Sequence, residues 1–171
     1  WKKQADPETA AELSALTDPA EIQDRFYREL EFGTGGLRGV MAAGTNRMNR
    51  YVIGKATQGL AEYIREQGDS ARRRGVVIAH DPRNNSRSFA QRAADVLLAN
   101  GINTYLFDSL RPTPMLSFAV RYLGAFAGIV ITASHNPAEY NGYKVYFEDG
   151  GQLPPSVSDR IIHYIDRIDP F

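Results

Sequence analysis

The sequence predicts an α/β fold of three layers, in which helices cover both faces of a mixed, mostly parallel sheet. Three observations lead to this prediction. Short apolar runs rich in β-branched residues alternate with segments whose apolar residues recur every three or four positions. The apolar runs are continuous, which is typical of strands buried on both faces. The chain of 171 residues is long enough for one well-packed core, so we expect a single α/β/α domain over residues 1–171.

The first third of the chain contains two helical patterns and a glycine-rich segment. Asp18 followed by Pro19 is typical of a helix start, and the apolar residues that follow are spaced four apart at Ile22, Phe26 and Leu30. Residues 32–39 are rich in glycine, which favours a loop with accessible backbone amides. A second helix, ending near Gly68, is predicted from the apolar positions Ile53, Ala56, Leu60 and Tyr63.

The remainder alternates strands and helices. Buried strands are predicted at residues 75–81, 102–108 and 126–132. Ser86 is a candidate cap for a helix whose apolar face is Phe89, Ala93, Val96 and Leu97. Another helix is predicted at residues 112–124. Residues 142–148 alternate, so Tyr143, Val145 and Phe147 should face one side of the sheet and Lys144, Tyr146 and Glu148 the other. The last helix is predicted from Val157, Ile161, Ile165 and Ile168.

The composition excludes several classes of protein. Apolar residues make up 43% and charged residues 23%, and twenty basic side chains balance twenty acidic ones, so no net positive field favours nucleic acid or an anionic membrane as a partner. The absence of cysteine excludes a disulfide framework and a thiolate zinc site, and it fits the reducing cytoplasm. No membrane span or signal peptide is visible. Because the chain begins at Trp1 and stops just after a helical pattern, we expect it to be a fragment of a longer protein.

Polar loops follow two of the buried strands. TASHNP, residues 132–137, follows one strand, and HDPRNNS, residues 80–86, follows another. Because ligands of open α/β sheets bind beyond the carboxyl ends of the strands, we expect both loops at one edge of the sheet.

Ser134 is the candidate nucleophile in the first of these loops. A serine hydroxyl needs an activating base or an electrostatic environment. His135 is its neighbour in sequence, but the Gly-x-Ser-x-Gly elbow of many serine hydrolases is missing, which disfavours a hydrolase. The alternative is that Ser134 caps a turn and Pro137 only ends the strand.

Several cationic residues could accompany Ser134. FGTGGLRG, residues 32–39, matches neither a P-loop nor a dinucleotide fingerprint, but it carries Arg38, whose guanidinium suits a phosphate. The alternative is a purely structural turn. Arg83 and Lys144 could likewise bind an anion or simply be solvated. The three histidines, His80, His135 and His163, lack the spacing of metal ligands. From the residues alone, Ser134, His135, Arg38, Arg83 and Lys144 suit an anionic, phosphorylated substrate without identifying the reaction.

A resemblance to a known family implies which reaction these residues carry out. TASHNP followed by NGYKVYF resembles the active-site serine loop of the α-D-phosphohexomutases, the phosphoglucomutase and phosphomannomutase superfamily, and FGTGGLRG resembles that family's N-terminal signature. RMNRYVIGKATQGLAEYI, residues 47–64, is similar to the branch of longer phosphoglucomutases and phosphopentomutases. The resemblance covers nearly the whole chain and implies the first of four domains, with the active-site cleft where all four meet.

The resemblance also implies roles for the residues. Ser134 would be carried as phosphoserine and would give its phosphoryl group to a sugar monophosphate through a bisphosphate intermediate. Ser134, Lys144 and His135 would be catalytic, with Lys144 as a proton shuttle. Arg38, Asn136, Ser134 and Lys144 would bind substrate. The activity would interconvert sugar 1-phosphates and 6-phosphates.

The same resemblance implies cofactors and partners. Mg²⁺ would bind through the phosphate on Ser134 and through aspartates of a second-domain loop that does not occur in this sequence, and a sugar bisphosphate would act as activator. The partners would be the phosphosugar and the remaining domains, so this piece alone should be inactive. Phosphoglucomutase activity is the first expectation, with phosphomannomutase or phosphopentomutase activity, or a non-catalytic phosphosugar-binding domain, as the alternatives.

Overall fold

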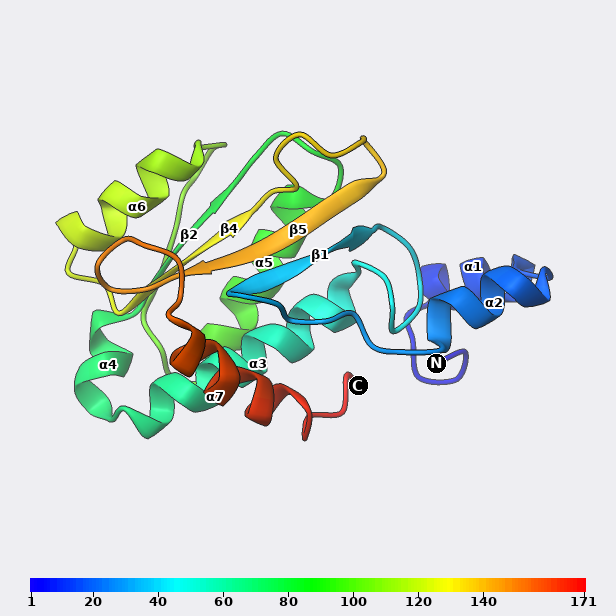
Figure 1. The fold of residues 1–171 in the computed structure, drawn as a ribbon, viewed down its shortest axis with the longest axis horizontal. Coiled ribbons are helices and arrows are strands. Elements are labelled where there is room, and N and C mark those ends of the chain that lie inside the picture. The colour runs from blue at the N-terminus through cyan, green and yellow to red at the C-terminus, as the bar shows by residue number, and fades with distance from the viewer.

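The computed structural model describes residues 1–171, in which one five-stranded sheet is flanked by helices (Figure 1). The strand order is β1-β5-β4-β2-β3. The strands are β1 (Gly36–Val40), β2 (Val76–His80), β3 (Thr104–Leu106), β4 (Ala127–Ile131) and β5 (Tyr140–Tyr146). The helices are α1 (Pro7–Ala15), α2 (Pro19–Phe26), α3 (Arg50–Glu66), α4 (Asp69–Arg74), α5 (Ser86–Ala99), α6 (Thr113–Tyr122) and α7 (Pro155–Ile165).

The direction of the strands confirms the predicted mixed sheet. β2 pairs in parallel with both β3 and β4, whereas β5 runs antiparallel to its two neighbours, β4 and β1. β1 therefore points the same way as β4, and only β5 opposes the common direction. The crossovers between the parallel strands contain helices α5 and α6, as this arrangement requires.

The two faces of the sheet are covered by different numbers of helices. Helices α3, α5 and α7 cover one face of the sheet, where Ile78, Ile129 and Tyr143 belong to a core of 27 buried residues. On the opposite face, α6 packs over β2 and β4, where Val77 and Val130 belong to a smaller core of 8 buried residues. Because α6 is the only helix packed on that face, β1 and the adjoining part of β5 are free of helices there (Figure 1). This open area becomes part of the candidate site.

Most of the expected elements are confirmed, with differences at their ends. β3 keeps only three residues of the predicted strand 102–108, and α7 ends before Ile168. α2 begins at Pro19 as predicted but ends at Phe26, so Leu30 lies outside it, and none of its residues is buried. Ile22 is 40% exposed because α2 lies beyond the end of the sheet. The spacing predicted the helix correctly but not its burial.

Two further expectations were wrong. The segment 32–39 is not a loop throughout, because its second half is strand β1, and glycine there depresses the strand signal. Ser86 does not cap α5. The cap position is Asn85, in the left-handed region with φ 61°, and the Ser86 hydroxyl instead donates to Asp81 Oδ1 at 2.6 Å. Helices α1 and α4 were not expected at all.

Asp6 holds the first helix against the rest of the fold. Its carboxylate caps α1 by accepting from the amides of Glu8 and Thr9, both at 3.1 Å. Its other oxygen accepts from the Tyr51 hydroxyl of α3 at 2.7 Å. The Tyr51 hydrogen bond, followed by that from the Thr9 amide, lowers the pKa of Asp6 from 3.8 to about 2.

We expect Asp6→Ala to lower the free energy of unfolding at neutral pH by about 1–2 kcal/mol, as lost caps do. Because the pKa of Asp6 is depressed, its stabilisation is present above 3.8 and disappears as the pH falls through about 2. Urea denaturation at several pH values measures this. The difference between parent and variant should shrink in that window, and a constant difference would contradict it. Asp18→Ala, which removes the one-bond cap of α2, should cost less.

Candidate functional site

The serine loop, residues 132–139, leaves the end of β4 in a constrained conformation. Ser134 has φ 56°, one of two non-glycine residues with a positive value. Its amide donates to Thr132 Oγ1 at 3.0 Å, and the Asn136 amide donates to the carbonyl of Ala133 at 3.1 Å. Thr132 and Ala133 are buried, whereas the side chain of Ser134 is exposed. A left-handed serine is costly, and such backbone conformations concentrate at functional sites.

Lys144 is the hydrogen-bond partner of the serine hydroxyl. Its Nζ donates to Ser134 Oγ at 3.0 Å. The register of the sheet explains the contact, because Lys144 of β5 lies opposite Val130 of β4 and so projects from the α6 face, toward the loop that follows β4. Neither His135 nor any carboxylate is hydrogen-bonded to the hydroxyl of Ser134, so the arrangement is not that of a Ser-His-Asp hydrolase.

Arg38 lies on the same face of the sheet. In β1, Leu37 enters the larger core, so its neighbours Gly36 and Arg38 face the other way. Gly36 pairs with Lys144, and Arg38 with Gly142. The side chain of Arg38 is exposed and has no hydrogen bond or ion pair within the protein. Its guanidinium is therefore free to bind an anion beside Lys144.

Glycine is required at both of these pairing positions. A Cβ on Gly36 would lie 2.1 Å from the carbonyl oxygen of Tyr143, and one on Gly142 would lie 2.5 Å from the carbonyl oxygen of Thr132. Only residues without a side chain allow β1, β5 and the start of the serine loop to approach so closely. These two glycines position the site, and the sequence did not single them out.

The environment of Lys144 lowers its pKa. Burial, followed by the positive charge of Arg38, lowers the pKa of Lys144 from its ordinary 10.5. Both causes disfavour the charged ammonium relative to that of a solvated lysine.

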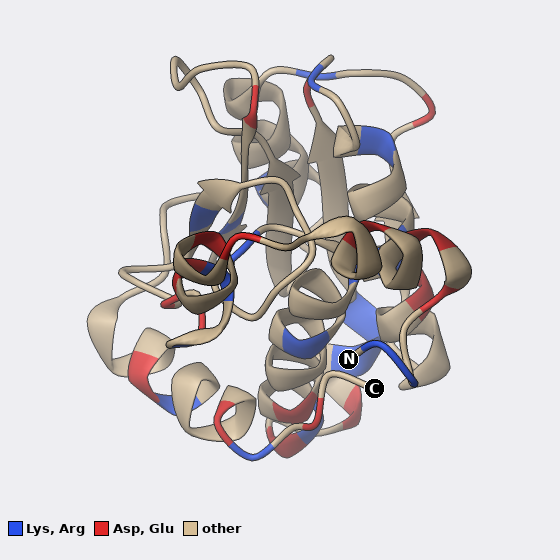
Figure 2. Ribbon diagram, turned by 90° about the vertical axis from the view of Figure 1, so that its right-hand side faces the viewer, with Lys and Arg blue, Asp and Glu red and all other residues tan.

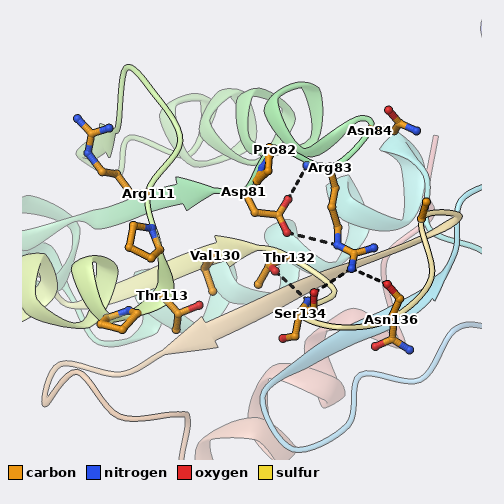
Figure 3. Close-up of a pocket in the computed structure, with 13 residues that line it drawn as sticks. Asp81, Pro82, Arg83, Asn84, Arg111, Thr113, Val130, Thr132, Ser134 and Asn136 are labelled. Carbon is orange, nitrogen blue, oxygen red and sulfur yellow. Dashed lines mark hydrogen bonds and ion pairs between the residues drawn. The ribbon is translucent and has the colours of Figure 1, made fainter.

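Two hollows flank the contact between Ser134 and Lys144, one lined by each residue. The first, of about 810 Å³, is lined by the polar loops after β2 and β4 and by the start of α6 (Figure 3). Ser134 lines this hollow together with Asp81, Asn84, Arg111 and Thr113. The second, of about 460 Å³, is lined by Arg38, Lys144 and the glycine-rich turn at residues 33–36. Both are open to solvent and suit a polar ligand that reaches the serine.

The expected juxtaposition of the two polar loops is confirmed, but Arg83 differs from expectation. The sequence analysis grouped Arg83 with Arg38 and Lys144 as candidates to bind an anionic substrate. In the structure its guanidinium donates to backbone carbonyls of the serine loop, among them those of Ser134 and Asn136, and it pairs with Asp81 (Figure 3). Arg83 therefore belongs to the architecture of the loop.

The other expected site residues are placed as follows. His135 and Asn136 follow Ser134 in the loop, and the Asn136 side-chain oxygen is buried without a hydrogen-bond partner. His80 ends β2, where its Nδ1 lies 3.0 Å from the carbonyl oxygen of Asp81, and His163 is exposed on α7. No three His, Cys, Asp or Glu residues cluster as metal ligands would.

Charged residues of both signs are mixed over the surface. Figure 2 shows acidic and basic positions interspersed over the helices, as expected from the equal numbers of the two charges. None of the helices combines the length and apolar character needed to cross a bilayer.

We expect Arg38→Met to raise the pKa of Lys144, because it removes the neighbouring positive charge. An NMR titration of the lysine ε-methylene resonance in the isolated chain measures this directly. The matched control is Arg28→Met, which removes a cation that lines the same hollow but does not act on Lys144. A pKa that is equal in the parent and in Arg38→Met would contradict the assigned electrostatic coupling.

Comparison with known proteins identifies the family. The family model "Phosphoglucomutase/phosphomannomutase, alpha/beta/alpha domain I" matches residues 29–170. A probable phosphoribomutase of Schizosaccharomyces pombe is 46% identical over 98% of this chain and 29% of its own length. A phosphoglucomutase of Staphylococcus haemolyticus is 41% identical over 98% of this chain and 30% of its own length.

A solved structure shows the same relation. The crystal structure of a putative phosphomannomutase from Thermus thermophilus superposes with a TM-score of 0.72 and 32% identity, over 81% of this chain and 30% of that one. This chain thus spans under a third of each of these relatives' length. The matched domain, the fold and the sequence identities together show that the chain belongs to the phosphoglucomutase/phosphomannomutase family, as an α/β/α domain I.

Proposed function

We propose that this chain is the phosphoserine-bearing domain of a phosphosugar mutase that interconverts sugar 1-phosphates and 6-phosphates. The observation that carries the proposal is the hydrogen bond between Lys144 Nζ and Ser134 Oγ, 3.0 Å long, between residues that each line a polar hollow. In this family of mutases, a serine with a cationic partner and no histidine base is suited to carrying a phosphoryl group rather than an acyl group.

The proposed reaction has two phosphoryl transfers. In the first, the bond between phosphorus and Ser134 Oγ breaks while a bond to a sugar hydroxyl oxygen forms. Lys144 receives the hydroxyl proton and supplies one to Ser134 Oγ, to which it is already hydrogen-bonded. The resulting sugar bisphosphate then turns over, and its other phosphoryl group returns to Ser134 by the reverse proton movements. The atoms and protons balance, so the enzyme is regenerated with the isomeric monophosphate released.

The remaining residues of the site position the group and stabilise its charge, which is what phosphoryl transfer mainly requires. Arg38 is free to pair with the oxygens of the transferring phosphoryl group. We assign His135 and Asn136 to the walls of the loop that the sugar contacts. The constrained backbone of Ser134 keeps its side chain in the lining of the hollow, where we propose that the sugar monophosphate and the bisphosphate intermediate reach it.

Mg²⁺ does not fit the residues of this chain alone. No cluster of metal-ligating side chains exists, so only a phosphate on Ser134 would supply oxygen ligands here. When bound, the ion would neutralise charge on the phosphoryl oxygens. We propose that its other ligands and the walls of the sugar site belong to further domains of a longer, four-domain protein, with a sugar bisphosphate as activator. The isolated chain would then be inactive. The cytoplasmic location stays a prediction from composition.

Glucose phosphate is the first substrate to test, because the relatives described above include a phosphoglucomutase. The relative named as a probable phosphoribomutase keeps pentose phosphates as an alternative, and the solved relative named as a putative phosphomannomutase keeps mannose phosphates. A non-catalytic phosphosugar-binding domain is the alternative of another class. The unpaired side chain of Arg38 would suit a binding domain as well as an enzyme. The hydrogen bond between Lys144 and Ser134 favours an enzyme.

We expect Ser134→Ala in the full-length protein to abolish conversion of glucose 1-phosphate to glucose 6-phosphate, because the phosphoryl carrier is lost. A coupled assay with Mg²⁺ and glucose 1,6-bisphosphate measures turnover, and intact-mass spectrometry measures the phosphate on the parent. Ser88→Ala, at an exposed serine of α5, is the matched control and should behave as the parent. The isolated chain, in the same assay, should show no turnover. Parental turnover by Ser134→Ala would refute the assignment.

We expect Lys144→Met to lower kcat by about 10²–10⁴-fold, the usual contribution of general acid–base catalysis, and to change KM much less. Lys144→Arg separates proton transfer from charge, because it keeps the cation but cannot readily release a proton. Steady-state kinetics of both variants are the measurement. If KM alone rises, or if Lys144→Arg is fully active, Lys144 binds substrate and does not shuttle a proton.

A further inference from the structure

We propose that Arg83 is a positioning residue, which holds the serine loop in the conformation that phosphoryl transfer needs. The inference rests on the function proposed above but concerns a residue outside the expected catalytic set. Arg83 lies in the loop after β2, more than fifty residues before the serine loop that it contacts. Its side chain is only 15% exposed, although it carries a full positive charge.

The guanidinium donates to four carbonyl groups, three in the serine loop and the fourth at Tyr140, the first residue of β5. Nη1 donates to the carbonyls of Pro137 and Tyr140 at 2.8 and 3.2 Å. Nη2 donates to the carbonyls of Ser134 and Asn136 at 2.9 and 2.6 Å. Carbonyl groups of the serine loop thus surround a single cation. One of these carbonyls belongs to Ser134, the proposed phosphoryl carrier.

The fifth donor is also engaged. Arg83 Nε lies 3.5 Å from Asp81 Oδ2, and the Arg83 amide donates to Asp81 Oδ1 at 2.9 Å. Four of the five N–H groups of the guanidinium are thus hydrogen-bonded to carbonyls, and the fifth, on Nε, faces the Asp81 carboxylate. Arg83 is therefore not a substrate ligand, and its effect must pass through the loop that it holds.

The same cluster reaches the strand of the catalytic lysine. The Ser86 hydroxyl, which donates to Asp81, accepts from Asn141 Nδ2 at 3.0 Å. Asn141 is fully buried, and its side-chain oxygen accepts from the amide of Gly142 at 2.8 Å. Asp81 therefore joins Arg83, which holds the serine, to the part of β5 that precedes Lys144. The network fixes both members of the Ser134–Lys144 pair relative to one another.

Arginine is required here for its shape as well as its charge. A lysine ammonium has three donors at one point and cannot span four carbonyls. The loop needs such support because Ser134 has a positive φ, a conformation that persists only when its surroundings hold it. A displacement of about 1 Å at a reacting group can cost about 10²-fold in rate.

The test compares Arg83→Lys and Arg83→Met in the full-length protein, with Arg87→Met as the matched control because Arg87 is exposed nearby on α5. We measure kcat and KM with glucose 1-phosphate, normalise them to phosphoserine content by intact mass, and follow hydrogen exchange of residues 132–142. Both Arg83 variants should lose about 10²-fold in kcat with little change in KM, and their loop amides should exchange faster. Arg87→Met should match the parent.

The outcomes separate the inference from the proposed function. A parent without phosphoserine or mutase turnover refutes the proposed function, whereas an active parent with a fully active Arg83→Lys overturns the positioning role. A fall in melting temperature with unchanged kcat per phosphorylated enzyme would show a merely structural arginine and also overturns it. If Arg83→Met does not fold, Asp81→Asn serves instead. It keeps Arg83 but removes the carboxylate that orients it, and should give a smaller loss of kcat with the same faster exchange.

Discussion

The pairing of β5 between β4 and β1 is the constraint on which the site depends. β5 is the one strand that runs against the others, and its register sets Lys144 opposite Val130 on one side and Gly36 on the other. Lys144 therefore reaches the serine that follows β4, while Arg38 of β1 lies on the same open face. A slip of one residue would turn Lys144 into the core and expose Tyr143. The glycines at 36 and 142 allow this close pairing and thereby protect the register.

The cations around the serine divide into two kinds with different physical roles. Arg83 is almost enclosed, and backbone carbonyls and Asp81 satisfy its donors, so its charge serves to shape a loop. Arg38 has no partner within the protein and lowers the pKa of Lys144 from across the strand pair. Two arginines that the sequence groups together thus differ, because the carbonyls of neighbouring segments and Asp81 surround Arg83, whereas the side chain of Arg38 is unpaired and exposed.

Much of the fold and of the site could be predicted from sequence because the relevant signals are local. The continuous apolar runs at residues 76–80 and 127–131 predicted strands that are fully buried. The alternation around Lys144 predicted which side chains of β5 face the core. β1 was missed because glycine carries no packing signal, and the burial of α2 was overestimated because periodicity shows a face but not whether anything covers it. Ser86 was a plausible cap by residue type, yet its hydroxyl has a stronger acceptor in Asp81.

The sequence by itself determined the layered α/β class, the location of the polar loops at strand ends, and the candidacy of Ser134, Lys144 and Arg38. Each of these depends on residue type and spacing within a short window. Only the tertiary structure decided that Lys144 is hydrogen-bonded to Ser134 and that the side chain of Arg38 is unpaired. It also decided that Arg83 donates its hydrogen bonds to carbonyl groups more than fifty residues away in the chain. Such contacts are set by strand register and by the reach of folded loops, which no local pattern encodes.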